Sequence, residues 1–225
     1  MVPVLSMQIW SLRGGNRMNK IFFTIIICLF IPAALGYSQL TSPDQLSIDA
    51  GVSIPTAPEQ FSDYWTNGVH IGIGSLYTTR YPYVGLISLN YNYFPFDEAQ
   101  LNKKLNMKQG TSTVSGASTT IYTLSPGMNY YFQSDPLFVP FISVGVSVSY
   151  LTVSEATVTY PLSVKTQQSR SKIFVSLNFG GGVSYPVSET MDILFSIDRA
   201  LGGVKDKTIN TDFYTITIGA LWDIQ

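Results

Sequence analysis

Apolar and polar side chains alternate along much of the chain. In residues 139–151, V-P-F-I-S-V-G-V-S-V-S-Y-L, isoleucine, valine and tyrosine fall on one side of an extended chain, and serine and glycine fall on the other. A period of two residues is typical of a β-strand. The same period predicts eight strands, at 46–54, 68–78, 83–95, 118–132, 139–151, 172–187, 191–203 and 212–224.

The connections between these strands differ in length in a regular way. Three are long (55–67, 96–117 and 152–171), three are short (79–82, 133–137 and 188–190), and the last, 204–211, is intermediate. In an antiparallel up-and-down order, all the long connections then lie at one end and both termini at the other. Short turns at one end and long loops at the other are typical of membrane β-barrels.

Composition separates a membrane barrel from a soluble barrel or sandwich. Hydrophobic residues make up 45% of the chain and charged residues 12%, whereas soluble domains carry about 25% charged residues. The polar strand faces carry Ser, Gly, Thr and Asn, which suit a narrow lumen better than a water-facing exterior. Strands enter a bilayer only as a closed barrel. The sequence therefore predicts an all-β fold, an eight-stranded antiparallel transmembrane β-barrel.

The apolar strand faces are then expected to contact lipid. The positions expected to do so are Ile142, Val144, Val146, Val148, Val175, Leu177, Ile216 and Ile218. Arg199 is an exception on such a face, and we expect it near a membrane interface or in a local register shift. Aromatic residues gather at strand ends, as in the girdles of membrane barrels. At the short-turn end the expected girdle is Tyr83, Tyr130, Phe132, Tyr185 and Trp222.

Several segments resemble a known family. They are G-V-H-I-G-I-G-S-L-Y, Y-V-G-L-I-S-L-N-Y-N-Y-F, M-N-Y-Y-F and P-L-F-V-P-F-I-S-V-G-V-S. Over about residues 45–225, the chain is similar to the small outer-membrane β-barrels, such as the transmembrane domain of OmpA and OmpX. The resemblance implies the outer membrane of a didermic bacterium and delivery by the barrel insertion machinery. Such barrels often end in an aromatic residue, whereas here the nearest is Trp222 in the ending L-W-D-I-Q.

The N-terminal segment has the features of a secretory signal peptide. A basic start at Met18-Asn19-Lys20 precedes an apolar run that ends in A-L-G at 34–36. We expect a signal peptide over 1–36, with Met18 as a candidate start, and a barrel domain over 37–225. Cleavage a few residues later, near Gln39, is the alternative site. An uncleaved membrane helix is the competing interpretation, but it needs about 20 apolar residues. Cys28, the only cysteine, falls within the signal peptide. The barrel domain therefore has no disulfide framework or thiolate metal site.

The sequence has few residues that could catalyse a reaction or bind a cofactor or a metal. His70 is the only histidine and is expected in the lumen, as are Asp49, Asp198 and Asp223. No residues are assigned to catalysis, to a cofactor or to a metal. A net charge of −1 gives no long-range attraction to nucleic acid.

The long connections are the other candidates for function. Phe61, Tyr64 and Trp65 in 55–67 are spaced to share a helical face, either as a lid on the rim or as a ligand contact. Lys103, Lys104 and Lys108 are candidates for contact with lipopolysaccharide. Residues 152–164 continue the alternation and predict a projecting hairpin whose strand edges are open to a partner.

Three hypotheses about function follow. The first is a monomeric, non-enzymatic envelope protein with a structural or adhesion role carried by its loops. The second is a narrow channel or small-ligand carrier, and the third is a lipid-modifying enzyme.

Overall fold

The described part of the chain is built almost entirely of strands. The computed structural model describes residues 43–57, 59–80, 82–100, 113–116, 118–132, 137–160, 163–202 and 211–224. The expected signal peptide and the lysines at 103, 104 and 108 lie outside these ranges. The long strands are β1 (Gln45–Ala57), β2 (Gly68–Arg80), β3 (Tyr83–Phe94), β5 (Thr119–Tyr131), β6 (Val139–Val153), β9 (Arg170–Ser188), β10 (Met191–Gly202) and β11 (Asp212–Asp223).

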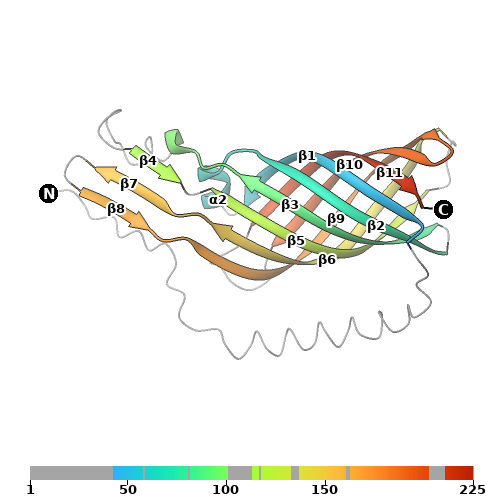
Figure 1. Cartoon of the computed structure of the whole chain (residues 1–225), viewed down its shortest axis with the longest axis horizontal. Coiled ribbons are helices and arrows are strands. Elements are labelled where there is room, and N and C mark those ends of the chain that lie inside the picture. Colours follow the sequence, from blue (N-terminus) through green and yellow to red (C-terminus); the bar gives the residue numbers. More distant parts are fainter. Residues whose placement is uncertain are drawn as a thin grey trace, which may run out of the picture. The chain divides into compact units, whose positions relative to one another are not determined.

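These eight strands close into a barrel in the order β1-β2-β3-β5-β6-β9-β10-β11, and β11 pairs back onto β1 (Figure 1). Every neighbouring pair is antiparallel. The predicted eight-stranded up-and-down barrel is therefore confirmed. The stretches predicted as strands at 46–54 and 191–203 form full strands of 13 and 12 residues.

The long connections carry structure of their own. The first holds a short helix, α2 (Glu59–Tyr64), and the third holds the hairpin of β7 (Ala156–Tyr160) and β8 (Ser163–Gln167). A further strand, β4 (Thr113–Gly116), pairs with β7 to make a three-stranded sheet in the order β4-β7-β8. The sequence predicted the hairpin but not β4, since four residues are too few to show a period. Among the described residues, no helix is both long enough and apolar enough to cross a membrane.

The outer face of the barrel is apolar. Exposed fractions are 53% for Ile142, 60% for Val144 and 53% for Ile218. Val148, Leu177 and Ile216 are also exposed, and Val146 and Val175 are partly exposed. All eight positions expected to face lipid thus lie on the outer face.

The interior has three layers, of which the sequence predicted only the middle one. Small polar side chains fill the centre, but apolar side chains fill each end. The loop end is the end of the barrel with the long connections, and the turn end is the end with the short ones. The loop-end cluster contains Phe61, Phe94, Ile121, Leu151, Phe174 and Phe213. The turn-end cluster contains Leu76, Val84, Tyr131, Phe141 and Leu221. In β6 the sequence pattern matches these three layers. Phe141 and Leu151 occupy inward positions on either side of the inward serine and glycine residues.

Candidate functional site

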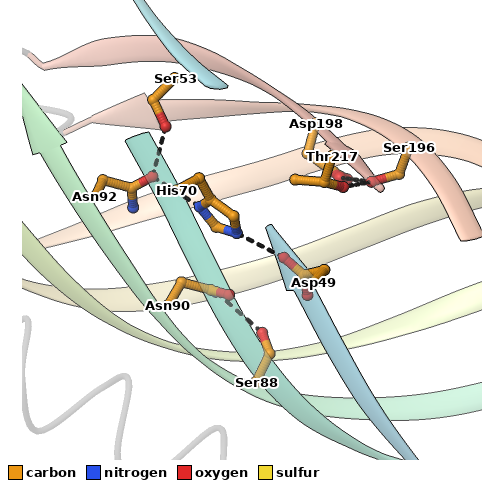
Figure 2. Close-up of polar contacts among 9 residues, drawn as sticks. All are labelled: Asp49, Ser53, His70, Ser88, Asn90, Asn92, Ser196, Asp198 and Thr217. Carbon is orange, nitrogen blue, oxygen red and sulfur yellow. Dashed lines mark hydrogen bonds and ion pairs between the residues drawn. The ribbon is translucent and has the colours of Figure 1, made fainter. Parts of the chain in front are cut away.

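His70 organises the first group of polar contacts in the lumen. Its Nε2 lies 2.8 Å from Asp49 Oδ1, and its Nδ1 lies 2.8 Å from Asn92 Oδ1. Ser53 Oγ donates to the same amide oxygen at 2.7 Å. Figure 2 shows the imidazole ring held between Asp49 of β1 and Asn92 of β3. His70 points inward, as predicted, because it alternates with the outward Val69 and Ile71.

A second group of polar contacts surrounds Asp198 on β10. Ser143 Oγ donates to Asp198 Oδ1 at 2.8 Å, and Ser196 Oγ donates to Asp198 Oδ2 at 2.7 Å. Ser196 Oγ is also 2.7 Å from Thr217 Oγ1. Figure 2 shows Ser196, Asp198 and Thr217 gathered on the same side of the lumen. Two hydroxyl donors thus stabilise the carboxylate, which has no ion-pair partner among the described residues.

The remaining central positions pair with one another. Ser147 and Ser176 are joined at 2.5 Å, Thr123 and Ser149 at 3.0 Å, and Asn178 donates to Ser125 at 2.9 Å. Buried polar groups require such partners because an unsatisfied group costs about 1–3 kcal/mol. Small hydroxyl side chains can meet across a narrow lumen, which explains why serine recurs on the inward faces.

Two of the acidic positions differ from the sequence-based expectation. Asp223 does not line the lumen, because it lies at the turn end of β11, where its Oδ1 accepts a hydrogen bond from the exposed Gln45 at 2.6 Å. At the end of a strand, alternation no longer shows whether a side chain points into the lumen, because the strand leaves the barrel there. Asp192 was not predicted to line the lumen, yet it accepts a hydrogen bond from the buried Ser184 at 2.7 Å. Asp192 precedes Ile193, which belongs to the outward set of this strand, so the alternation indicates an inward position for Asp192.

A cavity of about 170 Å³ lies in the central layer. Its lining includes Asp49, His70, Asn90, Asn129 and Asp198. The loop-end cluster and the turn-end cluster lie toward the two ends of the lumen. Asn129 Oδ1 is buried and accepts no hydrogen bond in the described structure. The cavity therefore has a hydrogen-bond acceptor for which the described residues supply no donor.

Within the described part of the lumen, His70 does not contact a serine that it could activate as a base. Activation of a serine requires a base within hydrogen-bond reach. Both ring nitrogens of His70 are taken by Asp49 and Asn92, and Ser53 bonds to Asn92 instead. Nor do the described residues contain a group of three or more His, Cys, Asp or Glu that could hold a metal ion.

The Asp198 network leads to a first prediction. We expect Ser196→Ala to lower the free energy of unfolding by about 1–3 kcal/mol, because it removes one of the donors to a desolvated carboxylate. Urea unfolding in lipid vesicles measures the change. Thr166→Ala on β8, an exposed position outside the barrel, is the matched control, and an equal effect of the two substitutions would contradict this role for Ser196.

Helix α2 lies against the loop end of the lumen. Phe61 is 5% exposed, and its ring centroid lies 5.1 Å from that of Phe94 and 5.6 Å from that of Trp65. Trp65 also forms a bridge with Phe96, and Tyr64 stacks on Phe96 at 6.4 Å. The three aromatic residues predicted to share a face are thus used within the protein. Of the two alternatives left by the sequence, this packing is that of a lid.

The positions of the expected girdle lie together at the turn end. Tyr83 and Tyr130 meet at 5.2 Å between ring centroids, and Tyr130 and Phe132 at 5.0 Å. Tyr185 packs against Phe138 at 5.4 Å, and Trp222, in the penultimate position of β11, is 40% exposed.

Arg199 lies near the loop end of β10. Its guanidinium carbon is 5.1 Å from the centre of the Tyr214 ring, and its Nη2 is 3.9 Å from Asp212 Oδ2. Tyr214 and Asp212 belong to the neighbouring strand β11, so one aromatic ring and one carboxylate offset the single cation among the outward positions of this strand.

Solved outer-membrane barrels share this architecture. Neisserial surface protein A is 15% identical, with a TM-score of 0.52 over 80% of this chain and 96% of its own. A major outer membrane protein from Thermus thermophilus is 12% identical, with a TM-score of 0.48 over 80% and 99%. Ail of Yersinia pestis is 13% identical, with a TM-score of 0.46 over 80% and 99%. At 15% identity, the similarity to Neisserial surface protein A shows the fold alone.

The sequence itself gives the family. No curated protein matches it. Residues 26–223, most of the chain, match the family described as "Outer membrane protein beta-barrel domain". The closed barrel, its apolar outer face and this match agree, and the chain belongs to the outer membrane protein β-barrel domain family, as an integral protein of the bacterial outer membrane.

Proposed function

We propose that the barrel is a non-enzymatic, non-conducting membrane anchor that presents its loop-end structure to partners outside the cell. The observation that carries this proposal is the filling of the lumen. Apolar clusters occupy both ends, and the polar centre is largely paired with itself. Such an interior stabilises a scaffold and gives a substrate no open route to His70.

The loop-end sheet is the proposed interaction surface. In the order β4-β7-β8, the outer edges of β4 and β8 have no neighbouring strand among the described residues. An exposed edge is a template for an added strand, and Val164 on β8 is 63% exposed. Natural proteins often protect such edges with charges, whereas β4 carries none and β8 carries one, Lys165. This composition supports recognition of an extended polypeptide segment.

Lipid, lipopolysaccharide and the insertion machinery complete the proposed set of partners. Acyl chains would contact the outward Ile, Val and Leu positions, and the aromatic positions at the turn end would lie at the interface. Lipopolysaccharide contact through Lys103, Lys104 and Lys108 and recognition by the insertion machinery rest on the sequence. A closed barrel has no free edge through which barrels could pair, which supports a monomer.

The channel hypothesis gives a direct prediction. In planar bilayers we expect the wild-type protein to show no steady ion conductance, because the apolar side chains of both clusters exclude water. Phe61→Ala combined with Phe141→Ala removes one large side chain from each cluster, and we expect it to give small, frequent openings. Steady conductance of the wild-type protein would instead support the narrow channel.

The loop-end sheet gives a second test. We expect replacement of residues 155–168 by a short Gly-Ser turn to abolish surface attachment of cells that display the protein, because the turn removes β7 and β8. The barrel strands are unchanged by this replacement, so heat-modifiable gel mobility and surface abundance should match those of the wild type. Unchanged attachment by a folded, loop-trimmed barrel would rule out this sheet as the adhesive element.

A further inference from the structure

We propose that the central cavity of the lumen binds a monovalent metal cation between Asp49 and Asn90. The two residues are cross-strand neighbours on either side of Gly72, since Asp49 pairs with Gly72 in β1 and β2, and Gly72 pairs with Asn90 in β2 and β3. Gly72 has no side chain to separate them. The site lies on the lumen side of this glycine, and its ligands are the oxygen atoms of the two neighbours.

The oxygen atoms converge on one point. A β-carbon at position 72 would lie 2.7 Å from Asn90 Oδ1 and 2.7 Å from each carboxylate oxygen of Asp49. A cation must clear the Cα atom, so it would lie slightly further into the lumen, between the same three atoms. Figure 2 shows both side chains reaching into the lumen from their strands, with Ser88 beside Asn90.

The three atoms share the same polarity. Asn90 Nδ2 donates to Ser88 Oγ at 3.1 Å, which turns Oδ1 of the same amide away from Ser88. Among the described residues, no hydrogen bond joins Asn90 to Asp49, and the donor that reaches Asp49 is His70 Nε2. Oxygen acceptors that face one another in a low-dielectric interior repel, and a cation between them turns this repulsion into attraction.

The charge of the cavity points in the same direction. Asp49 and Asp198 are its two carboxylates. Both ring nitrogens of His70 lie against oxygen atoms, Nε2 against Asp49 Oδ1 and Nδ1 against Asn92 Oδ1. Arg199 also borders the cavity, but it lies over Tyr214 and beside Asp212, which offsets its charge. Of the two proposed ligand residues, Asp49 carries a negative charge and Asn90 is neutral.

The cavity also has a buried polar atom away from the proposed site. The Asn129 side chain is 6% exposed, lines the same cavity, and its Oδ1 accepts no hydrogen bond in the described structure. Oxygen ligands of this type suit hard cations. Since Asp49 is the one charged residue among the proposed ligands, Na⁺ or K⁺ balances its charge, whereas a divalent ion would leave a net positive charge at the site.

Cation-dependent stability tests the proposal in the refolded, membrane-inserted protein. A ligand that binds the folded state alone lowers the unfolding equilibrium constant in proportion to its concentration above Kd. We expect a roughly tenfold fall in that constant as NaCl or KCl replaces choline chloride at fixed ionic strength, from about 10 mM to about 300 mM salt. Urea is the denaturant, because guanidinium is itself a cation. No difference from choline would overturn the proposal.

Matched glycine variants locate the site. Gly72→Ala places a methyl group against the three oxygen atoms, and we expect it to abolish the cation dependence. Gly74→Ala adds the same methyl group two residues along the same face, where it meets Ser47 Oγ at 2.6 Å and Leu86 Cδ1 at 3.3 Å instead. We expect this variant to keep the cation dependence. The same cation dependence in both variants would place the effect outside the proposed site.

Substitution of Asn90 separates a cation from a hydrogen bond between the amide and Asp49. Asn90→Asp adds a second carboxylate, so we expect lower stability in choline chloride and a steeper recovery with NaCl or KCl. If Asn90 instead donated its amide to Asp49, the variant would be destabilised equally in all three salts. Crystals of the wild-type protein grown with RbCl provide the direct readout. Anomalous scattering beside Gly72 is expected, and its absence there at full occupancy of other Rb⁺ positions would refute the site.

Discussion

We expect Phe94→Ala to lower the free energy of unfolding by about 3–5 kcal/mol, the range for removal of a fully buried aromatic side chain. Phe94 has no exposed surface and lies at the centre of the loop-end cluster. Its ring contacts Phe61 of α2 at 5.1 Å and Phe213 of β11 at 5.4 Å. The substitution would therefore loosen the lid and the wall of the barrel together. Urea unfolding in lipid vesicles, followed by tryptophan fluorescence, measures the change.

Phe195→Ala is the control for this substitution. Phe195 lies on the outer face of β10 and is 52% exposed. Acyl chains can fill the space that its ring leaves, so the cost should be well below that at position 94. Equal costs at the two positions would show that the loop end of the lumen is not a packed core.

We expect Val144→Lys to destabilise the inserted barrel by roughly 2–4 kcal/mol, the cost of a cationic side chain on the lipid face near the midplane. Val144 is 60% exposed and lies in the central part of β6. In a soluble barrel, exposure of this kind would make a lysine harmless. The size of the effect therefore shows whether lipid or water surrounds Val144. Reversible urea unfolding in vesicles of phosphatidylcholine gives the free energy.

Val164→Lys provides the comparison for the lysine substitution. Val164 is 63% exposed on β8, in the loop-end sheet outside the barrel. Because water surrounds this position in our account, its replacement should change the stability by less than about 0.5 kcal/mol, as for an ordinary surface site. A cost at position 164 that matched the cost at position 144 would contradict the assignment of the two surfaces.

The barrel could be predicted because its information is local and repeated. Alternation in each stretch sets which side chains point outward, and one misplaced residue would invert a whole strand. In β6, the run from Ile142 to Tyr150 alternates without interruption, and the structure follows it. The alternation of long and short connections then predicted an antiparallel up-and-down order. This step needed no knowledge of contacts between distant segments.

The contents of the lumen were harder to predict because they depend on contacts between distant strands. Phe94, Phe174 and Phe213 follow the inward alternation, but only the closed barrel brings them together with Phe61 of α2. The positions of Asp49 and Asn90 on either side of Gly72 likewise depend on the register of three strands. β4 was not predicted because its four residues are too few to show a period, and its pairing with β7 joins segments far apart in the chain.

The central claim is that the apolar side of each strand touches acyl chains while the serine and glycine side faces a sealed interior. Nitroxide labels placed one at a time at positions 142 to 149 in vesicles test it by power saturation. We predict that collision with oxygen, which concentrates in the bilayer, is high at Ile142, Val144 and Val148 and low at Ser143, Ser147 and Ser149. A water-soluble nickel reagent should reach neither set. Ready collision of that reagent with the label at Val144, or high access from water at Ser147, would contradict the account.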